Sequence, residues 1–409
     1  MTTGWRSTTV QEFVERGEAE LKTGPFGTQL HASDYVEHGT PVINVRNIGF
    51  GAIVPGKLEY ISHETVRRLA SHLLQADDIV FGRKGAVERH AFLKSGHDKW
   101  FQGSDCLRLR LSGPNLVPRF LSYCFLTEDH KQWMMNQCSH GATMASLNQG
   151  VIGRIPVLLP PPQLQHRIAA ILSAYDDLIE NNTRRIKILE EIAQMLYREW
   201  FVNFRFPGHE NVRMAESELG PIPGCWRVGR LEDAVVLQRG FDLPTSERIP
   251  GDVPIIAATG FNGTHNTARV KAPGVVTGRS GSLGTVMLVW EDFWPLNTAL
   301  WAREFRQSNP IHAYFTLQAI DLKGFNSGAA VPTLNRNDIH GLATVLPDRE
   351  TLNAFDECVA PLFTLKRNLE AKNTNLRTTR DFLLPKLISG EVPVEAADEA
   401  AAELMEQPA

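Results

Sequence analysis

Apolar residues recur at helical spacing in two long stretches of the chain. In the first, roughly Gln163 to Phe201, they are spaced mostly by three or four positions: Leu164, Ile168, Ile171, Tyr175, Leu178, Ile186, Leu189, Ile192, Leu196 and Trp200. In the second, after Pro347, they keep a near-strict heptad register: Leu352, Phe355, Val359, Leu362, Leu369, Leu376, Leu383 and Leu387. Helices of about 40 residues are far longer than the usual, about 11–12 residues. The pattern therefore predicts a coiled-coil pair, with long spacer helices over 163–206 and 348–390, rather than two ordinary core helices.

Polar residues interrupt the second stretch at heptad positions. Lys366, Asn373 and Arg380 take slots that apolar residues fill elsewhere, so one edge of the predicted helix seam is polar. Pro361 also falls inside this stretch, and proline removes a helical hydrogen bond and clashes with the preceding turn. We expect Pro361 either to kink the helix or to mark a late helix start.

The rest of the chain contains two copies of one sequence pattern. Short matches occur in the same order in both copies: Trp5-Arg6 with Trp226-Arg227, Thr40-Pro41-Val42-Ile43 with Val253-Pro254-Ile255-Ile256, Gly82-Arg83-Lys84-Gly85 with Gly278-Arg279-Ser280-Gly281, and Leu147-Asn148 with Leu334-Asn335. The separation between the partners shrinks along the chain, so the second copy has shorter loops on a similar frame. Each copy precedes one of the long stretches, which predicts the order globule, long helix, globule, long helix.

Each copy mixes strand-like and helix-like segments. Strands are expected at 43–45, 78–83, 106–111, 275–279 and 285–290, and helices at 117–137 and 309–323. The predicted class is therefore α+β, with two similar globular domains alternating with the two long helices. The domains cover residues 1–162 and 207–347, and the second range opens on a linker rich in Pro and Gly. Residues 391–409 hold six carboxylates and no basic residue, which predicts an acidic, disordered tail.

Composition limits the kinds of surface that the chain can present. With 42 Lys and Arg against 46 Asp and Glu, the net charge is −4, so any basic surface must be a local patch. Five cysteines without a Cys-x-x-Cys pair argue against a disulfide framework or a structural zinc site. The amino terminus lacks the apolar core of a signal peptide, and no uncharged apolar run approaches the length of a membrane span. These features predict a cytoplasmic protein in a reducing compartment.

The sequence lacks the common motifs of catalysis. It contains no Gly-x-x-x-x-Gly-Lys-Ser/Thr phosphate loop, no Gly-x-Gly-x-x-Gly after a strand and no Gly-x-Ser-x-Gly turn. Methyltransferases that act on exocyclic amines usually carry Asn/Asp-Pro-Pro-Tyr/Phe, whereas Leu159-Pro160-Pro161-Pro162-Gln163 lacks both the polar residue and the aromatic. The histidine spacing matches no zinc site. We therefore predict no catalytic residue, no metal and no cofactor in this chain.

Polar residues suited to reading bases gather instead at the predicted loops of each copy. In the first copy these are Asn44, Arg46, Asn47, Arg83, Lys84, Ser139, His140, Asn148 and Gln149. In the second copy they are Asn262, His265, Asn266, Arg279, Ser280, Asn335 and Arg336. Arg suits bidentate pairing with guanine and Asn or Gln suits adenine, while Lys and backbone amides mainly hold phosphates. The paired Gly-Arg-x-Gly loops are the best candidates, because they recur at equivalent places and glycine lets the backbone approach a groove closely.

Several segments together resemble the specificity subunit of a type I restriction–modification system, a bacterial defence system. They are PFGTQL at 25–30, TPVINVRNI at 40–48, the segments 141–172 and 186–201, GPIPGCW at 220–226 and LLPKLISGEV at 383–392. The resemblance implies two target recognition domains that each read one half of a split sequence in double-stranded DNA. It also implies that the two helices are antiparallel and act as a rigid spacer. A helix of about 40 residues spans about 60 Å, enough to hold two readers about one helical turn of DNA apart.

The same resemblance implies partners that carry out the chemistry. Two methyltransferase subunits would bind S-adenosylmethionine and methylate adenine, docking on apolar faces that the helix pair leaves exposed. Restriction subunits would translocate DNA with ATP and Mg. The assembled complex would be a site-specific deoxyribonuclease and an adenine-N6 DNA methyltransferase, whereas this chain would be a non-catalytic subunit.

Two other functions remain open from the sequence. One is a self-contained nuclease or methyltransferase fused to its reader, which requires a cofactor loop or metal-binding carboxylates. The other is a coiled-coil scaffold that binds only protein, in which Arg83 and Arg279 would have no role in recognition.

Overall fold

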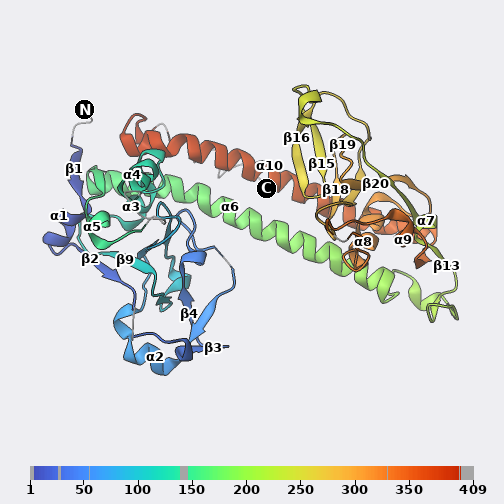
Figure 1. Ribbon diagram of the computed structural model, residues 1–409, viewed down its shortest axis with the longest axis horizontal. Coiled ribbons are helices and arrows are strands. Elements are labelled where there is room, and N and C mark those ends of the chain that lie inside the picture. Colours follow the sequence, from blue (N-terminus) through green and yellow to red (C-terminus); the bar gives the residue numbers. More distant parts are fainter. Residues whose placement is uncertain are drawn as a thin grey trace. The chain divides into compact units, whose positions relative to one another are not determined.

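The chain forms two compact units that share its two longest helices. The computed structural model describes residues 4–25, 29–54, 56–138, 146–328, 330–395 and 397. Unit 1 combines Met1–Asn182 with Ala371–Ala409, and unit 2 is Thr183–Glu370. Figure 1 shows that each unit contains a globular region packed on segments of α6 (Pro162–Tyr197) and α10 (Arg349–Ser389). Each long helix therefore contributes one segment to unit 1 and the other to unit 2.

The globular region of unit 1 is built around a four-stranded antiparallel sheet. Its strands lie in the order β2 (Ala19–Thr23), β9 (Cys106–Leu111), β6 (Ile79–Gly82) and β7 (His90–Phe92). All residues of β6 are buried, as expected for an inner strand of continuously apolar sequence. A separate antiparallel ladder joins β1 (Arg6–Thr9) to β10 (Pro156–Leu159), which brings the start of the chain next to the strand that precedes α6.

A second sheet and several short helices complete unit 1. The sheet has the order β3 (Tyr35–Val36), β5 (Glu59–Ile61), β4 (Thr40–Ile43) and β8 (Phe101–Gln102), in which only the β4–β8 pair of these described strands is parallel. The helices are α1 (Val10–Glu15), α2 (His63–Arg68), α3 (Pro118–Cys124), α4 (Glu128–Cys138) and α5 (Gln149–Gly153). Side-chain oxygens of Thr9 and Ser62 accept backbone hydrogen bonds at the starts of α1 and α2, which satisfies amides that have no partner within the helix.

One hydrophobic core joins the main sheet of unit 1 to both long helices. The same buried cluster contains residues from the sheet, from α6 and from α10, among them Phe81, Leu109, Ile168, Tyr175, Leu376 and Leu387. It also contains Val394 and Ala397, and Arg167 of α6 binds Glu395 at 2.7 Å. Val394 and Ala397 thus pack into the core of unit 1, whereas a disordered tail was predicted for 391–409. Residues 396 and 398–409 lie outside the described residues.

Unit 2 repeats this frame with the same strand order. Its main antiparallel sheet has the order β14 (Val235–Arg239), β20 (Ala299–Phe305), β17 (Gly274–Gly278) and β18 (Val286–Val289). Strand β15 (Val253–Ala257) pairs antiparallel with β16 (Gly260–His265) and parallel with β19 (Trp294–Pro295), as β4 does with β5 and β8. The ladder of β13 (Arg227–Arg230) with β21 (Ala343–Leu346) corresponds to that of β1 with β10. The two sequence copies therefore fold into one topology.

Packed aromatic rings hold the globular region of unit 2 to its segments of the long helices. The ring of Phe201 lies 4.9 Å from that of Phe355 and 5.7 Å from that of Trp226, measured between centroids. Phe206 stacks on Trp226 at 5.0 Å. Such pairs contribute about 0.5–1.5 kcal/mol each beyond the burial of their area. The remaining elements of unit 2 are β11 (Met214–Ala215), β12 (Ile222–Pro223), α7 (Leu231–Ala234), α8 (Pro310–Ala319) and α9 (Arg336–His340).

The two long helices pack antiparallel in each unit, and the polar heptad residues of α10 face α6. In unit 1, Asn373 pairs with Asn182, and Arg380 binds Asp176. In unit 2, Lys366 binds Glu190. Lys366 precedes Asn373 on α10 whereas Glu190 follows Asn182 on α6, as expected for antiparallel helices. Helix α6 continues beyond Tyr197 as one π turn, Arg198–Val202. Helix α10 begins at Arg349, so the prediction of a helix that starts late, at Pro361, is wrong.

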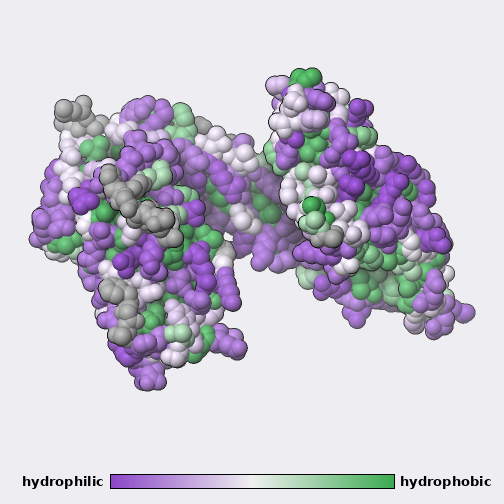
Figure 2. Space-filling view, viewed as in Figure 1, coloured by the Kyte–Doolittle hydropathy of each residue, from purple (hydrophilic) through white to green (hydrophobic). Residues whose placement is uncertain are grey.

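Several element limits differ from the predicted ones for local reasons. The strand expected at 43–45 ends at Ile43, because Val45–Asn47 form a 3-10 turn that starts at Asn44. The helix expected at 117–137 is two helices, α3 and α4, and that expected at 309–323 ends at Ala319. Hydrophilic residues cover much of the face drawn in Figure 2, and hydrophobic residues show as patches between them. Within the described part of the chain, none of the helices has the length and apolarity needed to cross a membrane.

Candidate nucleic-acid interface

The first Gly-Arg-x-Gly loop leaves the end of β6 and is held by backbone hydrogen bonds on both sides. The amide of Arg83 donates to the carbonyl of Asp105 at 2.8 Å, and the carbonyl of Arg83 accepts from the amide of Leu147 at 2.8 Å. An isolated antiparallel bridge then pairs Lys84 with Ser146. These backbone contacts hold the end of β6 against the segment that leads into α5.

The second loop, at the end of β17, is built in the same way. The amide of Arg279 donates to the carbonyl of Thr298 at 2.8 Å, and the amide of Leu334 donates to the carbonyl of Arg279 at 2.8 Å. Ser280 forms a bridge with Thr333, as Lys84 does with Ser146. The two loops therefore occupy the same place in the same topology, with matching backbone contacts.

A glycine in the left-handed region closes each loop. Gly85 has φ of 80° and Gly281 has φ of 89°. A Cβ atom added at either position would meet no heavy atom within 4 Å, so the requirement for glycine comes from the backbone conformation and not from crowding. The open space beside these two glycines is where a ligand could approach the backbone of each loop.

Side chains of the loops are positioned by neighbours that carry charge or carbonyl oxygens. In unit 1, the ammonium of Lys84 lies 3.3 Å from Asp105, and both side chains are about half-exposed. In unit 2, the guanidinium of Arg279 donates to the carbonyl oxygen of Asn297 at 3.1 Å. Exposed ion pairs of this kind are weak, so Lys84 could exchange Asp105 for a phosphate at little cost.

Two further residues brace the loop of unit 2 and were missed by sequence reasoning. The amide group of Asn297 donates to the carboxylate of Asp242, which also accepts from Arg239 at 3.2 Å. This chain of contacts ends at Arg279 through the Asn297 carbonyl. The signal for Asp242 was present in the segment GFDLPTSE at 240–247, where the second copy departs from the first. Asn297 is distant in sequence from both residues and carried no signal.

The first group of predicted readers, Asn44, Arg46 and Asn47, forms a hydrogen-bonded corner. The side chain of Asn44 donates to Glu59 at 2.7 Å, and Arg46 binds the same carboxylate at 2.7 Å. Asn47 is fully buried, and its side-chain oxygen accepts from the amide of Asn44. A buried side chain cannot reach a base edge, so the structure corrects the prediction for Asn47.

Two other readers predicted in the first copy, Asn148 and Gln149, lie close to the Gly-Arg-x-Gly loop. Asn148 follows Leu147, whose amide binds the loop, and caps α5 by accepting from the amide of Val151. Gln149 is exposed and donates to the hydroxyl of Thr23 at 3.0 Å. The structure therefore brings the loop and the Asn148-Gln149 pair together. Ser139 and His140 lie outside the described residues.

The candidates of the second copy divide between the loop and the β15–β16 hairpin. Exposed Arg336 and the α9 cap Asn335 follow Leu334, which binds Arg279, so they lie beside the loop with Ser280. The hairpin carries the exposed Asn262, which accepts two hydrogen bonds from Arg248, while Asn266, just past β16, accepts one from Thr267. His265, at the end of β16, is buried and its Nδ1 accepts from the amide of Ile249. Its burial removes His265 from the candidate readers.

An exposed aromatic ring beside β7 was also missed. Phe50 forms a bridge with His90 of β7 and is 49% exposed. The guanidinium of Arg89 and the ammonium of Lys131 each lie 5.2 Å from its ring centroid. The ring therefore holds two cations at the surface of unit 1. Lys131 comes from α4, and sequence spacing gives no sign that it meets Phe50.

Two basic residues of unit 1 form ion pairs within its sheet. Arg108 of β9 is almost fully buried and binds Glu20 at 2.7 Å. Arg110 forms two hydrogen bonds of 2.7 Å with the buried carboxylate of Asp78, and this contact raises the pKa of Arg110. These arginines stabilise the sheet and are not part of the candidate interface.

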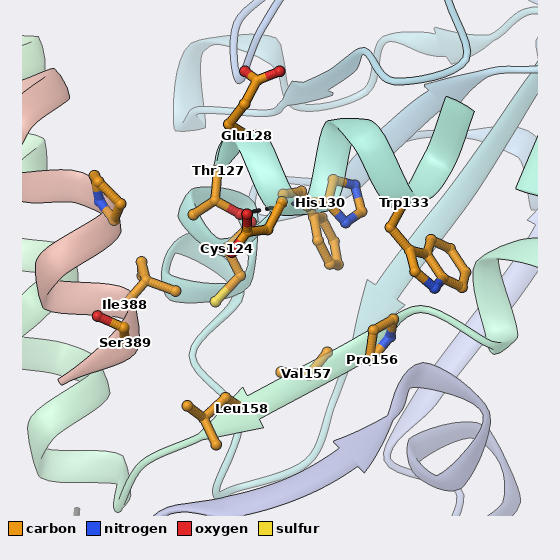
Figure 3. A pocket seen from close by; sticks show the side chains of 13 residues that line it. Cys124, Thr127, Glu128, His130, Trp133, Pro156, Val157, Leu158, Ile388 and Ser389 are labelled. Atoms are coloured by element: carbon orange, nitrogen blue, oxygen red, sulfur yellow. Dashed lines mark hydrogen bonds between the residues drawn. The ribbon is translucent and has the colours of Figure 1, made fainter. Parts of the chain in front are cut away.

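A cavity of about 400 Å³ lies in unit 1 among α4, β10 and the end of α10 (Figure 3). Thr127, His130 and Trp133 line one side, and Leu158 and Ile388 line the others. Burial lowers the pKa of His130 to about 4 and raises the pKa of the Cys124 thiol, so both are uncharged near pH 7. The cavity therefore offers neither a thiolate nor an imidazolium. Among the residues that the structure describes, no cluster of His, Cys, Asp and Glu is arranged to hold a metal ion.

The chain is similar in sequence to known specificity subunits. A family model described as the type I restriction modification DNA specificity domain matches residues 33–191. The type I restriction enzyme MjaIX specificity subunit of Methanocaldococcus jannaschii is 28% identical over 305 residues, which are 68% of this chain and 70% of that protein. The type I restriction enzyme HindI specificity subunit of Haemophilus influenzae is 24% identical over 166 residues, which are 39% of this chain and 36% of that protein.

The fold has a counterpart among solved structures. The crystal structure of a type I restriction–modification system S subunit from M. genitalium matches with a TM-score of 0.64 at 15% identity. The match covers 95% of this chain and 97% of that chain. At this identity the likeness concerns the fold, and together with the sequence matches it agrees with the resemblance found in the sequence.

We predict that Gly281→Ala destabilises unit 2, because a Cβ atom disfavours the left-handed conformation by about 1–2 kcal/mol. Thermal unfolding should show a lower midpoint than for the unchanged chain. Gly341→Ala is the matched control, since Gly341 has φ of −77° and equally open surroundings. Equal midpoints for the two variants would contradict the role assigned to Gly281.

Proposed function

We propose that this chain, a member of the specificity subunit family of type I restriction–modification systems, is the non-catalytic component that selects the DNA sequence. The observation that carries the proposal is the duplicated fold, in which each copy has one candidate recognition loop. Units 1 and 2 share one strand order, and each presents a Gly-Arg-x-Gly loop with the same backbone contacts. Each unit then reads one half of a bipartite target.

The chemistry of the loops suits the grooves of double-stranded DNA. Arg83 and Arg279 can each pair with the two acceptors of a guanine, while Lys84 and the loop amides can hold phosphates. The exposed Asn148-Gln149 pair and Arg336 lie beside these loops and widen the edge available to bases. Because each unit carries one such loop, the chain would read its target at two separate places.

The long helices serve as the spacer between the two readings. Segments of α6 and α10 belong to the core of unit 1 and to the core of unit 2. A paired helix resists bending and stretching far more than a flexible linker, whose ends fluctuate with the square root of its length. The helix pair would therefore set a fixed number of unread base pairs between the two half-sites.

Partner subunits supply the catalysis in this proposal. Ile188 and Met195 are seven residues apart on α6, and they are 47% and 56% exposed. Val202, in the π turn that follows, is 54% exposed. This apolar stripe (Ile188, Met195 and Val202) suits an apolar helix face of a methyltransferase subunit. S-adenosylmethionine is assigned to two such subunits, and ATP and Mg to restriction subunits.

The two alternative functions have less support. A self-contained enzyme would need a reactive centre. The two Gly-Arg-x-Gly loops offer arginines and backbone amides, and the cavity of unit 1 offers the uncharged side chains of His130 and Cys124. A protein-only scaffold would not require the matched backbone contacts of the two Gly-Arg-x-Gly loops. Binding to DNA by the assembled complex separates this scaffold from a DNA reader.

We predict a bipartite methylation motif in cells that carry this chain and its methyltransferase partner. Sequencing that reports N6-methyladenine should give two short specified sequences separated by unspecified bases. Exchange of residues 207–347 for the corresponding region of a relative should change one half and leave the other. A continuous motif, or one unchanged by this exchange, would count against the proposal.

We predict that Arg83→Ala combined with Arg279→Ala weakens specific DNA binding by at least about tenfold, because each bidentate pair is worth about 1–3 kcal/mol. Binding of the complex to its target should be measured at one fixed salt concentration. Lysine at both positions should recover affinity only in part, since lysine keeps the charge without the bidentate geometry. Arg16→Ala, at an exposed arginine on α1's end, is the control. Unchanged binding by the double variant would favour the scaffold.

We predict that Ile188→Ser combined with Met195→Ser reduces co-purification of the methyltransferase subunits, because it removes the apolar stripe from α6. The thermal unfolding midpoint of the isolated chain should stay the same, since both side chains are exposed. Gln194→Ser, at an exposed neighbour on the same helix, should leave the complex intact. Full recovery of the complex with the double variant would show that the partner docks elsewhere.

A further inference from the structure

A pair of buried asparagines connects the two long helices in unit 1. The side-chain amide of Asn182 on α6 donates to the side-chain oxygen of Asn373 on α10 at 3.0 Å. Asn373 also donates to the carbonyl of Ile179 at 3.4 Å. Asn182 is 7% exposed and Asn373 is 2% exposed, so water contributes little to their solvation.

The surroundings of this pair are apolar. Ile179 and Leu376, one turn away on either helix, belong to the hydrophobic core of unit 1. An asparagine in such a seam is stable only opposite a polar partner, because an unsatisfied buried amide loses its hydrogen bonds to water without replacement. Leucine at both positions would pack well and carry no such requirement.

Charged pairs continue the polar edge of the seam. In unit 1, Arg380 binds Asp176 at 2.7 Å, and both side chains are largely buried. In unit 2, Lys366 binds Glu190 at 2.7 Å. Lys366, Asn373 and Arg380 are spaced by seven residues, so the polar groups of α10 recur once in each heptad.

A shift of the helices by one heptad would break each of these matches. Where the two helices contact only each other, apolar residues would still meet apolar residues, because they repeat every seven positions. Asn373, however, would then face either Tyr175 or Leu189 in place of Asn182. The apolar pattern alone therefore permits several registers, and the polar pairs favour one of them.

We propose that the Asn182–Asn373 pair is a positioning element that fixes the register of the helix pair and thereby the length of the spacer between the two half-sites. This inference rests on the proposed function, in which the helix pair separates two DNA readers. A shift of seven residues moves one helix along the other by about 10 Å, at about 1.5 Å per residue. Base pairs stack at about 3.4 Å, so this shift corresponds to a spacer changed by about three base pairs.

The test is the double variant Asn182→Leu with Asn373→Leu in the complete complex with its methyltransferase. The full chain should fold with a thermal unfolding midpoint equal to or higher than that of the unchanged chain, because two leucines replace a buried polar pair. Methylation sequencing should recover both half-sites at the original spacer and, in addition, at a spacer altered by about three base pairs. Leu376→Met, an apolar exchange in the same seam, is the control and should keep a single spacer.

The outcomes separate this inference from the proposed function. Both half-sites at the single original spacer would overturn the register role while leaving the proposed function intact. A midpoint below that of the unchanged chain would also overturn it, since the pair would then stabilise the fold instead of selecting among registers. A continuous motif in the unchanged complex would overturn the proposed function itself. The single variant Asn182→Leu should unfold at a lower temperature than the double variant, because it leaves Asn373 opposite leucine.

Discussion

The packing of α6 against α10 is the constraint on which both units depend. In unit 1 these helices supply Ile168, Tyr175 and Leu387 to the same core as the main sheet. In unit 2 they supply Trp200 and Phe355 to the aromatic cluster. A recognition domain that ended at residue 162 would leave that apolar surface exposed, so the helices are part of each reader and not a connection added to it.

The two copies of the frame attach to the helices through different chemistry. In unit 1 the carboxylate of Asp176 accepts from Arg119 at 2.7 Å and from Tyr123 at 2.6 Å, while it also binds Arg380. In unit 2 the helix after the last strand of the main sheet, α8, instead places Phe315 against Phe363 at 6.1 Å. Salt screens a partly exposed charge network more than it affects ring packing. Although the two globular regions share one topology, their contacts with the long helices differ, so one region could not replace the other at those contacts.

The sequence predicted the long helices and the duplicated frame because both leave periodic or repeated signals. Heptad spacing identified α10 even though Pro361 lies inside it, and the Gly-Arg-x-Gly matches identified loops with the same backbone contacts. Individual reader residues were harder to predict, because an asparagine after a strand suits a base contact and a turn equally well. Asn47 belongs to the turn, and only the position of distant Glu59 shows that Asn44 and Arg46 share one carboxylate. Contacts between segments far apart in sequence decide such cases.

The proposed function separates the selection of a DNA sequence from the strength of DNA binding. Phosphate contacts supply nearly all of the non-specific affinity of DNA-binding proteins and a large share of the specific affinity, and they need many available cations. The net charge here is −4, and arginines such as Arg108 and Arg110 are held inside the sheet by Glu20 and Asp78. A chain of this kind is suited to discriminate between base pairs while partner subunits add backbone contacts. In the proposed function, docking of a methyltransferase subunit on an exposed helix face would connect recognition to methylation, because the same subunit would strengthen binding and modify the DNA.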